Sequence, residues 1–182
     1  RHIRRWNWHQ QCLTIAITTM SDYISERFDE MSKALHLDCK VRGLATYEDF
    51  REVAIERVIK PQNVVSLDLQ DVKAICQSGD VFDALSFDIT KDKADCFQSA
   101  IRQLQQAHPR MALSALLCNL PMRDRVEVHT WAASLHDVFE EMESRDIEMK
   151  FGLFYSNETP PEGVIIAAFT SQNAEKSSKR GQ

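Results

Sequence analysis

The stretch MALSALLCNL, residues 111–120, decides the fold that the sequence predicts. It is apolar at almost every position and shows no alternation of polar and apolar side chains. Such a run is typical of a strand that is buried on both faces. Amphipathic helical patterns precede and follow it, over residues 92–107 and 126–144. We therefore expect this strand at the centre of a sheet that helices cover.

Three further strands are expected around this central one. Residues 84–89 precede it, and the runs IEMKFGLFYS (147–156) and EGVIIAAFTS (162–171) follow it. The polar segment NETPPE, residues 157–162, is predicted to be a hairpin loop between the last two strands. Because helices alternate with strands, the sequence predicts an α+β two-layer sandwich with a four-stranded mixed sheet covered by helices.

The N-terminal quarter gives a weaker pattern. Residues 12–20, CLTIAITTM, alternate between two faces and predict a strand. Ser21 can cap a helix after it, and the Arg42–Gly43 region interrupts that helix. A long helix is then predicted over residues 46–59. Pro61 ends it, since Pro disfavours helix at the residue before it and lacks a backbone donor.

These patterns divide the chain into three parts. Residues 1–45 form a strand-and-helix segment without further assignment. Residues 46–171 form the main domain, which opens with the long helix. Residues 172–182 are polar and basic, and we expect them to be a flexible tail.

The composition is that of a globular protein, with 182 residues, 43% hydrophobic and 27% charged, and a net charge of −5. Basic clusters lie only at the two ends, whereas nucleic-acid binders usually carry a basic stripe. No nucleic-acid partner is therefore expected. No apolar run approaches the ~18 residues of a membrane span. Five scattered cysteines without a CxxC pair indicate reduced thiols and a cytoplasmic location.

The familiar patterns of cofactor and metal sites are not found in the sequence. Five scattered glycines make no phosphate-binding loop. His129 and His136 lie seven residues apart on one predicted helix, too far for one metal ion. Cys118 ends the buried strand, where a thiol is more often a small core residue than a nucleophile. We expect no cofactor and no metal in this chain, and no self-contained enzyme.

The segment SLDLQDV, residues 66–72, places two acids three residues apart at a predicted helix start. Asp68 falls at the N-cap and Asp71 in the first turn, where carboxylates accept hydrogen bonds from unpaired backbone N–H groups. A cap of this kind is worth about 0.5–2 kcal/mol. Two interpretations stay open: the acids stabilise the helix only, or they also face another molecule.

This segment resembles a motif of the bacterial division tubulin FtsZ and its superfamily. In that family a long helix and a Pro-containing loop lead to Asn-x-Asp-apolar-x-Asp-apolar, a pattern that here spans Ser66 to Val72. Three later segments resemble the family in the same order: SALLCNL (114–120), RVEVHTWAASLHDVFEEM (125–142), and MKFGLFYSNETPPEGVIIAAFTS (149–171) with its Phe151–Gly152 step. The resemblance covers residues 46–171, which look like the FtsZ C-terminal domain.

The resemblance implies protein–protein association with cytoskeletal filaments of the cell-division type in a bacterial cytoplasm. In the family, the acidic loop of one subunit reaches the nucleotide of the next and positions water for attack on the terminal phosphate. Asp68 and Asp71 would be those catalytic acids, acting in trans, and Ser66 and Gln70 would lie at the interface. GTP would sit on a partner, which is an FtsZ-like filament subunit or a second copy of this chain.

Departures from the family pattern limit this carry-over. Ser66 stands where the family has Asn, and Gln62–Asn63 stands where Gly is usual. The Gly-rich GTP-binding half is not among these 182 residues. The chain is therefore not expected to be a GTPase on its own, although its acids could contribute to hydrolysis in a neighbouring subunit.

Two other functions stay open. A small enzyme or ligand-binding domain on an unrelated α+β sandwich would have a pocket where the strands 111–120 and 147–156 end. That pocket would lie near Asn119 and hold a titratable group with a shifted pKa. A structural subunit of a larger assembly would use the Trp-rich start, residues 1–11, as an interface arm.

Overall fold

The computed structural model describes residues 8–61, 63–90 and 92–171, with side chains from residue 20 onward. Twelve elements follow one another along the described chain. They are α1 (Trp8–Leu35), α2 (Leu37–Lys40), α3 (Tyr47–Glu52), the π-helix η1 (Val53–Ile59), β1 (Asn63–Val65), α4 (Leu69–Gln77), β2 (Val81–Asp88), α5 (Lys93–Ala107), β3 (Met111–Met122), α6 (Val126–Ser144), β4 (Glu148–Tyr155) and β5 (Glu162–Ser171).

The strands form one mixed sheet in the order β1-β4-β3-β5-β2. β3 lies at its centre, parallel to β4 on one side and antiparallel to β5 on the other. β2 pairs antiparallel with β5 along its whole length, and β1 pairs with the end of β4. The predicted α+β sandwich with a mixed sheet is confirmed, and the short strand β1 adds a fifth strand to the four expected. Two layers were predicted, whereas helices pack on both faces of the sheet and make three.

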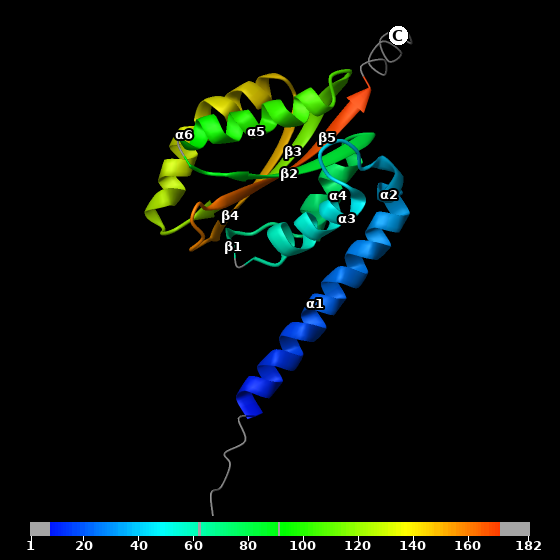
Figure 1. The fold of residues 1–182 in the computed structure, drawn as a ribbon, viewed down its shortest axis with the longest axis vertical. Coiled ribbons are helices and arrows are strands. Elements are labelled where there is room, and N and C mark those ends of the chain that lie inside the picture. The colour runs from blue at the N-terminus through cyan, green and yellow to red at the C-terminus, as the bar shows by residue number, and fades with distance from the viewer. Residues whose placement is uncertain (1–7, 62, 91, 172–182) are drawn as a thin grey trace, which may run out of the picture.

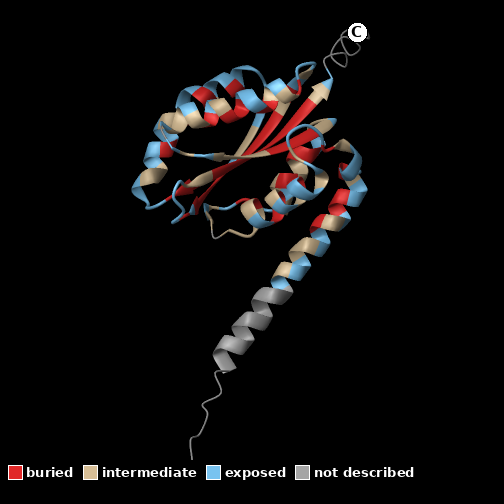
Figure 2. Cartoon of the chain, in the orientation of Figure 1, coloured by how far each residue is buried: buried red, intermediate tan, exposed pale blue. Residues whose placement is uncertain are grey.

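Helices lie on both faces of this sheet (Figure 1). α5 and α6 cover one face, where Phe97 and Trp131 are buried. α4, the α3–η1 helix and the C-terminal end of α1 cover the other, where Phe28 and Phe50 are buried. The two inner strands β3 and β5 are buried along most of their length between the two helical layers (Figure 2). The molecule therefore has two apolar cores, one on each side of the sheet.

The strand predicted over residues 12–20 is wrong, because these residues belong to α1. The alternation that suggested it is short, and Leu13, Ile17 and Met20 also fit the spacing of a helical stripe. The same spacing continues to Phe28, which is fully buried against the body. A helix satisfies its own backbone hydrogen bonds, whereas a strand here would need a sheet edge to pair with. The N-terminal part of α1 extends away from the body (Figure 1).

The hairpin predicted for the last two strands is also wrong. β4 and β5 do not pair with each other, because β3 lies between them. β3, α6 and β4 form a parallel crossover in which the connecting helix packs on the sheet. Residues 157–161 then lead the chain to the far side of β3. The local sequence pattern identifies both strands but does not determine which strand each of them pairs with.

The helix predicted over residues 46–59 is confirmed as α3 followed without a break by η1. The N–H of Lys60 closes η1 on the carbonyl of Ile55, one residue farther than in an α-helix. The predicted tail, residues 172–182, lies outside the described residues, as do Gln62 and residues 1–7 of the predicted interface arm. None of the described helices is both long and apolar enough to cross a membrane.

Candidate functional site

The loop that leads to the two acids is held against the sheet by one apolar side chain. Leu67 is only 5% exposed. It lies over Gly152 of β4, where an added Cβ would come within 2.8 Å of Leu67 Cδ1 and 2.7 Å of Asn119 Oδ1. The absence of a side chain at Gly152 therefore creates the space that the loop occupies. This gives the Phe151–Gly152 step a packing role.

Asn119 holds the other end of the same loop. It is fully buried in β3, directly opposite Gly152 in the pairing of β3 with β4. Its Nδ2 donates a hydrogen bond of 2.7 Å to the carbonyl oxygen of Arg57 in η1. In an α-helix that carbonyl would accept a hydrogen bond from Pro61, which has no N–H. Asn119 thus fixes the helix end that precedes the loop.

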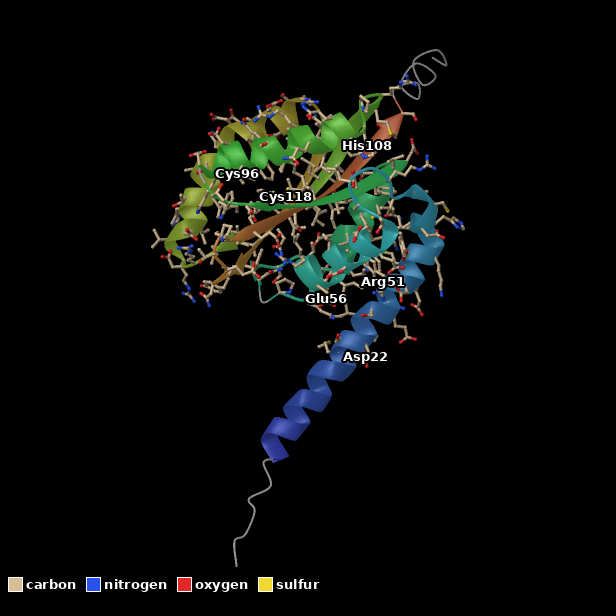
Figure 3. All side chains as sticks on the ribbon, in the orientation of Figure 1. Asp22, Arg51, Glu56, Cys96, His108 and Cys118 are labelled. Carbon is tan, nitrogen blue, oxygen red and sulfur yellow. The ribbon has the colours of Figure 1, made fainter. Side chains whose placement is uncertain are left out.

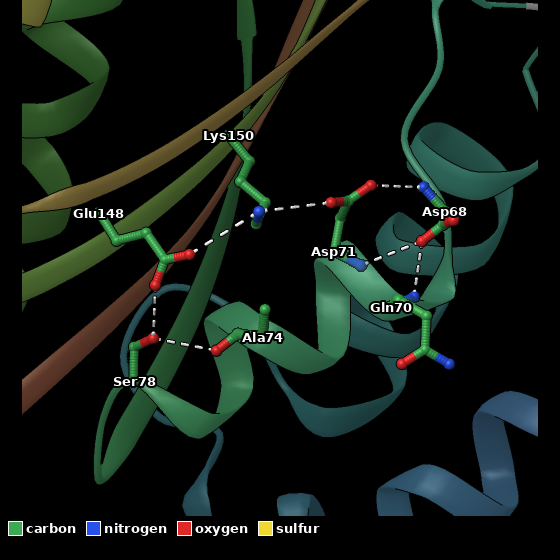
Figure 4. Close-up of polar contacts among 7 residues, drawn as sticks. All are labelled: Asp68, Gln70, Asp71, Ala74, Ser78, Glu148 and Lys150. Carbon is green, nitrogen blue, oxygen red and sulfur yellow. Dashed lines mark hydrogen bonds and ion pairs between the residues drawn. The ribbon is translucent and has the colours of Figure 1, made fainter.

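Asp68 and Asp71 form a capping box at the start of α4 (Figure 4). Asp68 Oδ1 accepts hydrogen bonds from the backbone N–H groups of Gln70, at 2.7 Å, and of Asp71, at 3.1 Å. Asp71 Oδ2 in return accepts the N–H of Asp68, at 3.0 Å. The helix-capping interpretation of both acids is therefore confirmed, and it leaves open whether they also face another molecule.

A chain of polar contacts links this box to the edge of the sheet. Lys150 Nζ lies 3.6 Å from Asp71 Oδ1 and 3.8 Å from Glu148 Oε1. Ser78, just beyond α4, donates to the Ala74 carbonyl and lies 3.2 Å from Glu148. Figure 4 shows that these contacts run from one end of α4 to the other, alongside β4. They hold α4 at a fixed position relative to the sheet.

The resulting surface carries two carboxylates. Ser66, Asp68 and Gln70 are exposed, and Asp71 is partly covered by its contact with Lys150. We call these four residues the acidic helix start. Within the described chain, Asp68 Oδ2 has no hydrogen-bond partner, so it can accept one from water, from a cationic side chain or from another molecule.

The acidic helix start is unsuited to binding phosphate by itself. A helix N-terminus attracts anions through its unpaired N–H groups and its dipole. Here Asp68 already occupies two of those N–H groups and brings a negative charge to the same place. The described residues also contain no group of three or more His, Cys, Asp or Glu side chains arranged to hold a metal ion.

The pocket that the ligand-binding alternative predicts at Asn119 is not found there. The Asn119 side chain is completely buried and bonded to η1, so no ligand reaches it. Its neighbour Cys118 lies within the sheet (Figure 3). Burial raises the pKa of the Cys118 thiol far above its ordinary value, which keeps it protonated and unreactive.

Two features of the structure were not identified from the sequence. A cleft of about 700 Å³ lies along β4 beside α6. A buried carboxylate, Asp83 of β2, accepts the N–H groups of Leu44 and Ala45, both at 2.8 Å, and lies 2.9 Å from His108 Nε2. An acid inside an apolar strand was the available signal for Asp83. The cleft depends on the order of the strands in the sheet, for which the sequence gives no local signal.

Comparison with known proteins gives a distant likeness of fold. No protein-family model matches the sequence, and no curated protein matches it. Among solved structures, the chain is similar to an empty FtsZ dimer from M. jannaschii, with a TM-score of 0.46 and 13% identity over 68% of this chain and 35% of that one. A mutant FtsZ from M. jannaschii gives a TM-score of 0.43 and 12% identity over 68% and 36%. The match thus spans about a third of the length of these FtsZ chains.

Proposed function

We propose that this chain is a protein–protein association domain that presents the acidic helix start to a subunit of an FtsZ-like filament. In this proposal it is not a GTPase on its own. The observation that carries the proposal is a pair of carboxylates, the exposed Asp68 and the partly covered Asp71, held rigidly by their own backbone and by the sheet. The order of sequence motifs over residues 46–171 supports the choice of filament.

Rigid acids suit an interface that must be formed at a precise distance. Leu67, Asn119 and the capping box fix the backbone on both sides of Asp68 before any partner arrives. Little conformational entropy is then lost when the surface binds. A partner surface that bears cationic side chains, or a nucleotide with its metal ion, would complement the two negative charges.

The same geometry is compatible with a role in trans for the acids. Asp68 Oδ2 remains available while Oδ1 caps the helix, so one carboxylate can do both. Placed against the nucleotide of a neighbouring subunit, this oxygen would orient an attacking water, and Asp71 would add negative charge beside it. The domain would then alter GTP turnover in that neighbour, or block the filament end that it occupies.

The test measures filament sedimentation and phosphate release by a bacterial FtsZ with and without this protein. Asp68→Asn removes the charge but keeps a good N-cap residue, so folding is preserved. Asp92→Asn is the matched control, because Asp92 caps α5 in the same way. We expect a dose-dependent effect of the wild-type chain that Asp68→Asn abolishes and Asp92→Asn retains. An effect that survives Asp68→Asn unchanged would show that the acidic helix start is not the contact.

A further inference from the structure

The edge of the sheet beside β4 is only partly covered. β3 pairs with β4 from Glu148 to Tyr155 on one side. On the other side, β1 reaches only Leu153 and Phe154. No described strand pairs with residues 148–152 on that side. The outward-facing N–H and C=O groups of this stretch are thus not used by any described strand, and Glu148 and Phe151 in it are exposed, which is what an added strand needs.

The cleft of about 700 Å³ surrounds the first half of β4, where it is lined by residues of both faces of that strand, by Ser78 after α4 and by Ser114 of β3. One wall is apolar and belongs to the α6 side of the sheet, with Ile147, Met149, Phe139 and Phe151. The rings of Phe139 and Phe151 lie 5.5 Å apart, and Phe151 is 41% exposed. An exposed aromatic pair beside unpaired strand backbone is suited to binding the side chains of an added strand.

The rim of the cleft is acidic. Glu143, Asp146 and Glu148 line it. No described cationic side chain lies within ion-pair distance of Glu143 or Asp146, and Glu148 has only the distant Lys150, at 3.8 Å. The rim therefore carries negative charge that the described chain does not neutralise, which favours a cationic occupant.

We propose that this β4 cleft binds an extended segment of a partner protein in which apolar side chains alternate with Lys or Arg. The partner backbone would pair with residues 148–152 as an added strand. Because strand side chains alternate between the two faces, one set would pack on Phe139 and Phe151. The other set would point to the α4 side, toward Glu148 and Ser78. The proposal does not depend on the acidic helix start.

Two other occupants fit less well. A second copy of this chain, paired through residues 148–152, would place Lys150 opposite its own counterpart and bring two acidic rims together. The chain's own residues 172–182 contain Lys176, Lys179 and Arg180 but no apolar side chain larger than Ala for the aromatic wall. A segment of another protein in which basic and apolar residues alternate can pair with the β4 backbone, pack on the aromatic wall and neutralise the acidic rim.

The experiment measures fluorescence anisotropy of a labelled eight-residue peptide in which Lys alternates with Val and Phe. The full chain should bind it saturably. Phe151→Ser should weaken binding at least about tenfold, since central aromatic contacts dominate interface energies. Tyr155→Ser is the matched control, because Tyr155 is an equally exposed aromatic residue, 48% exposed, at the far end of the same strand. It should change the affinity less than about twofold.

A second variant tests charge without touching the apolar wall. Glu148→Lys changes an exposed side chain that the partner's cationic residues would face, so folding should be preserved, and it should also weaken binding about tenfold. Hydrogen exchange should slow at amides within 148–152 when the peptide binds. Equal affinity for a peptide with Glu in place of Lys would overturn the proposal. Slowed amide exchange on peptide binding at sites other than β4 would also overturn it. So would dimers that form without the peptide and protect the β4 amides from exchange.

Discussion

Gly152, which has no side chain, allows the loop before α4 to lie close to the sheet. Gly152→Ala would place a methyl group 2.7 Å from Asn119 Oδ1 and 2.8 Å from Leu67, both of which are buried. We expect this variant to lose about 1–3 kcal/mol of unfolding free energy, because neither neighbour can move freely. Urea denaturation measures the loss.

Gly163→Ala is the control for that measurement, since it is also a strand glycine. The nearest atoms there are the outer ring carbons of Phe87, a half-buried side chain that can rotate. A smaller loss is expected for it. If both variants lost the same stability, the tight contact of Gly152 with Leu67 would not be what holds the loop.

The cysteines should differ sharply in reactivity. Burial raises the pKa of the Cys76 thiol to about 12 and raises that of Cys118 even further, so both stay protonated at pH 8. Cys39 is exposed, although its hydrogen bond to Asp38 also raises its pKa. Iodoacetamide followed by peptide mass spectrometry should label Cys39 in the folded protein. Cys76 and Cys118 should react only after addition of denaturant; rapid labelling of Cys118 in the folded state would contradict the burial.

At the scale of elements, α4 and α5 begin with the same chemistry but sit in different settings. Asp68 caps α4 through two N–H groups, and Asp92 caps α5 through two. Asp68→Ala should cost about 0.5–2 kcal/mol of unfolding free energy and Asp68→Asn much less, because Asn caps nearly as well as Asp. Thermal or urea unfolding of the two variants checks this. Equal losses would mean that the charge of Asp68, rather than its cap, stabilises the fold.

The start of α4 was the element best predicted from sequence. Its determinants are local: an acid at the cap, a second acid three residues on and a buried face that follows. The first half of α1 was predicted wrongly because the pattern of apolar residues over 12–20 fits a strand and a helix equally well. The apolar spacing that continues to Phe28 is what favours the helix. The strand β1 was not predicted because three residues are too few to show an alternation of polar and apolar side chains.

At the scale of the whole molecule, Asp83 and His108 join the two helical layers across the edge of the sheet. Asp83 belongs to the edge strand β2 and holds residues 44 and 45 on one side. His108 follows α5, which covers the other face, and its ring lies on Phe169 with centroids 4.4 Å apart. Figure 3 shows His108 at the end of α5 near this edge.

Removing His108 should therefore weaken both layers together. His108→Ala leaves the buried Asp83 carboxylate without one of its partners, at an expected cost of about 1–3 kcal/mol in unfolding free energy. Amide exchange at Leu44 and Ala45 should accelerate. His136→Ala is the control, since His136 and its partner Glu140 are both exposed, and about 0.5 kcal/mol or less is expected. Identical behaviour of the two variants would exclude a joining role for His108.

Sequence reasoning reached the acidic helix start but not the β4 cleft, and the cause is topological. The acids lie in one short segment, so their mutual distance follows from helix geometry alone. The cleft brings together residues from α6, β4 and the end of α4, and its position depends on β1 ending after three residues. The order of the strands determines which side of β4 is left uncovered, and no local sequence pattern of this chain predicts that order.

The strand order also sets when the fold can form during synthesis. β2 emerges from the ribosome early, but its ladder partners are residues 162–169 of β5, the last strand of the sheet. β3, the central strand, likewise waits for β4 and β5. The β2–β5 and β3–β5 ladders can therefore form only after translation has passed residue 170, whereas β3 and β4 can pair earlier. Until then the apolar strand β2 lacks the strand that it pairs with, and such an unpaired strand is a surface through which a nascent chain can aggregate.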